Sequence, residues 1–211
     1  MSRKLNRRSF AAATAGIVLA AGANTNVKAG PGNLVTNLAN SQGSQDDERQ
    51  GPREAAFERD YEPPKFKPSW KREQINRQLA QDFVIYAHSD LAMVKKLLDK
   101  EPGLLNATMD WGAGDWETGL GGASHMGNKE IVSYLLERGA RMDLFCAAMM
   151  GQIDAVRSFL TLQPNLIDAK GPHGFTLHFH AQVGGDDAQD VLDYLQSIKE
   201  VELKPIPFLK Q

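Results

Sequence analysis

The stretch GNKEIVSYLLERGA, residues 127–140, decides the fold class of this chain. Its apolar residues recur one helical turn apart, as the pair Ile131-Val132 followed by Leu135-Leu136, which is the stripe of an amphipathic helix and not the alternation of a strand. Asn128 is a good N-cap residue, and Gly139 stands where a left-handed C-cap is favoured. The stretch therefore predicts a helix at about residues 129–138.

A related pattern recurs along the chain: two small residues, two variable residues and a glycine, followed by apolar pairs. It occurs in residues 123–127 and 147–151, with an extended copy at 181–185 and a degenerate one at 87–89. Each copy predicts a pair of helices. We expect first helices at about residues 73–88, 118–126, 144–150 and 176–183, and second helices at about 91–100, 129–138, 153–162 and 188–199.

These residues also carry a resemblance to a known family. Residues 127–140 look like the second half of an ankyrin repeat, and GFTLH at residues 174–178 is similar to the entry of another. Residues 72–199 resemble exported bacterial ankyrin-repeat proteins with an Asp-Trp-Gly-x-Gly-Asp-Trp-Glu loop and a Gly-Pro-His-Gly turn. The resemblance implies an all-α ankyrin-repeat solenoid of about four helix-pair units with irregular hairpin loops, the first and last units acting as caps.

The amino terminus reads as an export signal. Arg7 and Arg8, followed by Phe10 and a short acid-free apolar run, resemble the twin-arginine motif. Cleavage is expected after Ala29, with Ala23 as the alternative. We therefore expect a signal peptide at 1–29, a disordered, Pro-rich spacer at 30–71, the repeat domain at 72–199 and a tail at 200–211. This reading predicts the twin-arginine translocase as a partner during export, a periplasmic or otherwise exported location, and no membrane span in the mature form.

The charge and the cysteine content exclude several classes of protein. Five of the 24 basic residues and none of the 26 acidic ones lie in residues 1–29, so the remainder carries a formal net charge of −7. This balance argues against binding to nucleic acid. Cys146 is the only cysteine, so no intrachain disulfide forms. We expect a monomer that needs no cofactor.

The resemblance implies binding of another protein, not catalysis. The residues before each turn glycine are expected to face the partner across a groove, and the two tryptophans of the 109–117 loop are candidate interface anchors. Two other interpretations stay open: Met149 and Met150 could fill gaps left by the missing hairpin loop of the third unit, and the 109–117 loop could cover the edge of the stack. The candidate partner-binding residues are Trp111, Asp115, Trp116, His125, Met126, Met149, Met150 and His173.

The methionines, histidines and acidic residues raise two further functional classes. A soft-metal protein would hold Cu(I) through the thioethers of Met126, Met149 and Met150 together with His125. An enzyme could draw on the residues His125, His173, His178, His180, Asp110 and Asp115, but their spacing matches no hydrolase or zincin motif. The sequence therefore predicts no catalytic residue and no metal ligand, and the Cu(I) site is the alternative function.

Overall fold

The computed structural model describes residues 54–69 and 71–209, so the predicted export signal and cleavage sites lie outside the described residues. Two units are distinguished, and the helices described below all belong to the unit that contains residues 69–211. Residues 54–68 of the other unit form no helix or strand, and their side chains are exposed. Among the described residues, no helix has the length and apolar character needed to cross a membrane.

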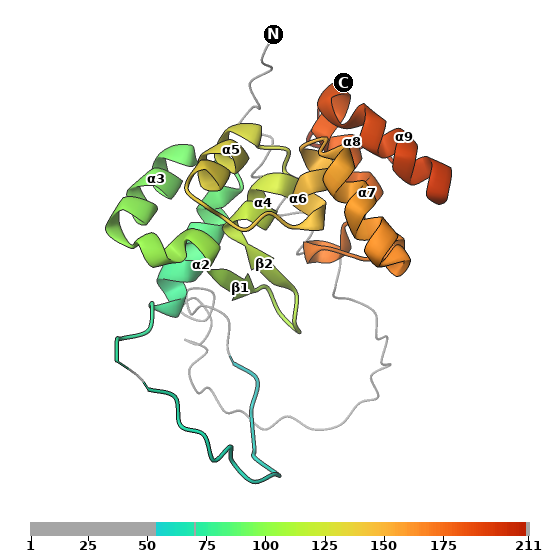
Figure 1. The fold of residues 1–211 in the computed structure, drawn as a ribbon. Helices are drawn as coiled ribbons and strands as arrows, with labels where there is room; N and C mark the ends of the chain where they lie inside the picture. Colours follow the sequence, from blue (N-terminus) through green and yellow to red (C-terminus); the bar gives the residue numbers. More distant parts are fainter. Residues whose placement is uncertain (1–53, 70, 210–211) are drawn as a thin grey trace, which may run out of the picture. The chain divides into compact units, whose positions relative to one another are not determined.

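The described chain after residue 76 is built mainly from helices that follow one another in pairs (Figure 1). Helices were expected close to each of these positions, and the mostly helical class is confirmed. The pairs are α2 (Arg77–Ala87) with α3 (Leu91–Lys100), α4 (Gly119–His125) with α5 (Lys129–Glu137), α6 (Leu144–Met149) with α7 (Ile153–Leu162), and α8 (Leu177–Gly184) with α9 (Gln189–Ile198). Short 3-10 turns connect them: η2 (Pro102–Asn106), η3 (Pro164–Asp168), η4 (Pro172–Gly174) and η5 (Gly185–Ala188).

Side-chain caps define where these helices begin. The carboxylate of Asp90 accepts a hydrogen bond from the Met93 amide at 3.0 Å, and Asn128 accepts one from the Ile131 amide at 3.3 Å. Thr118 caps α4 in the same way, through the Gly121 amide. Each of these bonds satisfies an amide that has no partner within the first turn.

The helices pack in two rows. In one row α2 contacts α4, α4 contacts α6, and α6 contacts α8; in the other, α3 contacts α5 and α7 contacts α9. Two buried apolar clusters lie between the rows, one centred on α2 to α5 and one on α6 to α9. The residues after α9, expected to be a plain tail, include Ile206, which is buried in the first cluster. Gln182 of α8 fixes this segment by donating to the Lys204 carbonyl at 2.9 Å.

A short antiparallel hairpin interrupts the helices, and the all-α prediction did not include it. Strand β1 (Thr108–Asp110) pairs with β2 (Trp116–Thr118), with Met109 opposite Glu117. The loop between them is held by Asp110, whose Oδ1 accepts from the amides of Gly112 and Gly114 at 2.8 and 3.0 Å. Because alternate residues of a strand face opposite sides, this register turns Glu117 inward while Trp116 stays exposed.

Candidate metal centre

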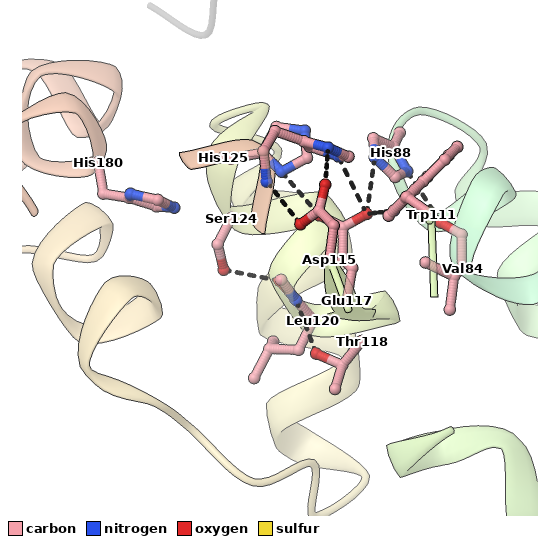
Figure 2. A network of polar contacts seen from close by, with 12 residues as sticks. Val84, His88, Trp111, Asp115, Glu117, Thr118, Leu120, Ser124, His125 and His180 are labelled. Carbon is pink, nitrogen blue, oxygen red and sulfur yellow. Dashed lines mark hydrogen bonds and ion pairs between the residues drawn. The ribbon is translucent and has the colours of Figure 1, made fainter. Parts of the chain in front are cut away.

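Four side chains from separate parts of the chain converge beside the hairpin. They are His88 at the end of α2, Glu117 in β2, His125 at the end of α4, and His173 in η4. One potential ligand atom from each lies within 4.8 Å of the others. Figure 2 shows His88, His125 and Trp111 arranged around the Glu117 carboxylate. Among the described residues this is the one group of three or more histidine, cysteine or acidic side chains that could hold an ion.

His88 is oriented by the backbone of its own helix. Its Nδ1 lies 2.9 Å from the Val84 carbonyl oxygen, and only a protonated ring nitrogen can donate to a carbonyl. In the neutral ring, Nε2 therefore carries the lone pair. This Nε2 lies 3.3 Å from Glu117 Oε2.

The approach of His88 to α4 requires glycine at position 122. A β-carbon there would lie 2.7 Å from His88 Cε1 and 2.8 Å from its Nδ1, well inside van der Waals contact. The ring thus occupies the space that a side chain on α4 would fill. The glycine at position 122 of α4 therefore makes room for the His88 ring.

We predict that Gly122→Ala displaces the His88 ring, breaks its bond to Val84 and weakens metal binding about 10-fold or more, as loss of ligand orientation does. The control is Gly139→Ala, because a β-carbon at position 139 would have no neighbour within 4 Å and this glycine is not part of the centre. Calorimetric titration of both variants with Zn²⁺ measures the effect. Equal affinities in the two variants would show that His88 does not need this space.

His173 is oriented by an acidic residue of the hairpin. Asp115 Oδ1 accepts from the His173 backbone amide at 2.9 Å, and Oδ2 lies 2.9 Å from the ring Nδ1. With Nδ1 donating to this carboxylate, Nε2 is left to face Glu117 Oε2 at 3.6 Å. A carboxylate behind an imidazole in this way is a common arrangement around protein-bound metals.

Glu117 is the buried anion of the group, with a fully buried side chain. Its Oε2 accepts a hydrogen bond of 2.8 Å from Trp111 Nε1. Burial by itself would raise the pKa of this carboxyl group, but contact with the imidazoles of His125, His173 and His88 holds the pKa well below its usual range. Glu117 is therefore ionised, and burial lowers the pKa of His125, which favours the neutral imidazole that a metal needs.

The contact between Glu117 and His125 is close but is not a hydrogen bond. Glu117 Oε1 and His125 Nδ1 lie 2.9 Å apart, yet both are buried polar atoms without a hydrogen-bond partner among the described residues. A plain ion-paired network would align an N–H group with this oxygen, because an unpaired buried polar atom is costly. This arrangement, in which the oxygen and the nitrogen are close but not aligned with each other, is expected when both atoms face a common metal ion.

The structure gathers some of the predicted binding residues and separates others. His125 and His173 belong to the centre, and Asp115 and Trp111 contact its ligands. Trp116 is 61% exposed on the outer side of the hairpin. Met149 is fully buried, Met126 is 7% exposed and Met150 is half-buried. The burial of Met149 agrees with the interpretation that Met149 and Met150 fill gaps in the core.

Sequence reasoning did not include His88 or Glu117 among the candidate site residues and predicted no metal ligand. His178 and His180, which it did consider, lie outside the centre and contact the backbone carbonyls of Lys199 and Thr176 at 2.9 and 2.8 Å. The sequence marked Glu117 only as an acidic residue of the 109–117 loop, and His88 only as a partner-facing position of the degenerate repeat copy.

Comparison of the chain with protein-family models, with curated proteins and with solved structures gives no match.

Proposed function

We propose that this protein binds one divalent first-row transition-metal ion, with Zn²⁺ as the reference ion. The ligands are His88 Nε2, His125 Nδ1, His173 Nε2 and the Glu117 carboxylate. The observation that carries the proposal is the convergence of these four groups within 4.8 Å, with Glu117 Oε1 and His125 Nδ1 buried, 2.9 Å apart and without a hydrogen-bond partner among the described residues.

The spacing of the donor atoms suits a tetrahedral ion. Bonds of about 2.0–2.1 Å to nitrogen and oxygen place neighbouring ligand atoms about 3.3 Å apart. Glu117 Oε2 lies 3.3 Å from His88 Nε2 and 3.6 Å from His173 Nε2, close to this tetrahedral edge, whereas His125 Nδ1 lies 2.9 Å from the other oxygen, Oε1. All four ligand atoms lie within 4.8 Å of one another, so tetrahedral coordination requires side-chain movement toward a common ion.

The groups behind the ligands support the same conclusion. Val84 orients His88, Asp115 orients His173, and Trp111 donates to Glu117. Such outer contacts fix the tautomer and direction of a ligand and are typical of metal centres. A ligand set of three imidazoles and one carboxylate suits zinc and its neighbours; calcium and magnesium prefer oxygen donors, and Cu(I) prefers sulfur.

The ligands come from elements far apart in the sequence, which suggests a structural role. A bound ion would join α2, the hairpin, α4 and the η4 turn through bonds absent from the unfolded chain. Its binding free energy then adds to the stability of the fold. We propose that the ion stabilises the domain and performs no chemistry, in line with the prediction that the protein is not an enzyme.

Calorimetric titration of the untagged, metal-stripped full chain with Zn²⁺ tests the proposal. We expect one ion per chain and a rise in melting temperature that a chelator reverses, since free metal at 100 times Kd adds about 2.7 kcal/mol. The matched control is His178→Gln, which alters a buried histidine outside the centre and should still bind one ion. His125→Gln, in contrast, should lose binding. If His178→Gln lost Zn²⁺ binding as completely as His125→Gln, the proposed ligand set would be contradicted.

We further propose that the helix pairs are ankyrin-type repeats of an exported protein that binds another protein. The support is the repeated helix pairing and the contacts between successive helices of one row. One observation favours a partner at the hairpin side: a groove of about 310 Å³ is lined by Trp116, Phe145, Lys170 and Pro172, among others. Export and the identity of the partner remain predictions from the sequence.

A further inference from the structure

His173 differs from the other three ligands in its exposure. Its side chain is 22% exposed, whereas those of His88, Glu117 and His125 are 5%, 0% and 5% exposed. It lies in the three-residue turn η4, not at the end of an α-helix or in a strand. Its φ of 58° is in the left-handed region, which is unfavourable for a residue with a β-carbon. His173 is thus the least firmly held ligand.

A single carboxylate controls the position of this turn relative to the centre. Asp115 contacts both the backbone amide and the ring Nδ1 of His173. Asp115 also lines the groove of about 310 Å³, together with Gly171 and Pro172, the two residues that precede His173. Solvent in this groove therefore lies next to the most exposed ligand and its anchor.

The rings around His173 define what could replace it. The ring centroids of Trp111 and His125 lie 5.2 Å from that of His173, and the Phe175 centroid lies 6.0 Å away. The interplanar angles of 64°, 86° and 78° give edge-to-face contacts with a flat ring. A planar aromatic nitrogen donor satisfies both these contacts and a first-row metal ion.

We propose that His173 is the exchangeable ligand of the centre and that a small-molecule nitrogen heterocycle of the imidazole type takes its place on the ion. The inference rests on the proposed metal binding. In the exchange, the bond from the ion to His173 Nε2 breaks and a bond to the incoming ring nitrogen forms. Both rings bind the ion in their neutral form, so no electron is transferred and the charge of the centre is unchanged; solvent takes up or supplies any proton on the free rings.

The test uses the full chain loaded with Co²⁺, whose visible spectrum reports its coordination, with imidazole as the probe. Asp115→Asn removes the charge that anchors His173. Its matched control is Asp110→Asn, an acidic residue of the same loop whose carboxylate contacts the amides of Gly112 and Gly114. We measure the imidazole concentration at which half of the change in the Co²⁺ spectrum has occurred. In Asp115→Asn we expect this concentration to be about 10-fold or more lower than in the control and the wild type.

A second variant keeps the test decisive if Asp115→Asn disturbs the hairpin. In His173→Gly, we expect added imidazole to restore the wild-type Co²⁺ spectrum, because the vacated space matches that ring. Equal imidazole responses in Asp115→Asn and Asp110→Asn, or no recovery in folded His173→Gly, would overturn the exchange proposal. Failure of the proposed function would appear earlier and separately, as a wild-type chain that binds no Co²⁺ before imidazole is added.

Discussion

Glu117→Gln is expected to weaken Zn²⁺ binding by a factor of about 100 or more. The change keeps the size of the side chain and an oxygen that can accept from Trp111, but it removes the only anionic ligand of the centre. Loss of an outer contact alone costs about 10–100-fold in metal affinity, so loss of a charged ligand should reach at least the upper end. Calorimetric titration with Zn²⁺ measures the change directly.

The control for this variant is Glu130→Gln, which removes one negative charge from an exposed position in the first turn of α5. Its affinity should match that of the wild type, because Glu130 is not part of the centre. If Glu117→Gln bound Zn²⁺ as tightly as Glu130→Gln, the carboxylate would not be a ligand. Far-UV circular dichroism of both variants shows that each retains its helices.

Gly151→Ala should cause a large loss of stability in the helical domain, about 3 kcal/mol or more. A β-carbon at this position would lie 1.9 Å from the Asp187 carbonyl oxygen, and the backbone adopts a φ of +70°. Both the steric conflict and the backbone conformation oppose alanine. The end of α6 would have to move away from η5, which it meets through its backbone at this point. Urea unfolding measures the change.

Gly139→Ala separates the two causes. This glycine has a φ of +90°, but a β-carbon there would have no neighbour within 4 Å. Only the left-handed conformation is penalised, and we expect a loss of about 1 kcal/mol. Similar losses for the two variants would mean that α6 and η5 do not approach as closely as the structure shows.

The helices were predictable because local signals determine them. The residue type and position of Asn128 predict an N-cap, and Asn128 makes the expected hydrogen bond. Gly139 was assigned to a left-handed C-cap, and its φ is positive. The apolar stripe of residues 129–138 needs only one helical turn of context, so a single sequence suffices to find it.

The centre was not predictable in the same way because its geometry depends on contacts between distant elements. His88 and Glu117 lie in different elements, and His173 reaches them only because Asp115 holds its turn. No short spacing motif links these residues. The hairpin was missed for a related reason: the glycines of the loop indicated a turn, but its strands are only three residues long each.

The predicted methionine groove shows that the repeat pattern predicts the position of a residue in a helix but not its burial. The repeat pattern placed Met126 and Met149 correctly at the ends of α4 and α6. It could not predict whether neighbouring elements cover these side chains. In the structure both side chains are buried, and Met149 belongs to the first apolar cluster. Burial depends on the neighbouring elements, which the repeat pattern alone does not specify.

X-ray absorption at the zinc edge of the Zn²⁺-loaded full chain tests the central claim most directly. The account predicts a single shell of four nitrogen and oxygen ligands at about 2.0–2.1 Å, with the outer scattering of three imidazole rings. A sulfur shell at about 2.3 Å would indicate cysteine or methionine ligands and contradict the site. A shell of six oxygens without imidazole scattering would also contradict it, because the ion would then lie outside the group formed by His88, Glu117, His125 and His173.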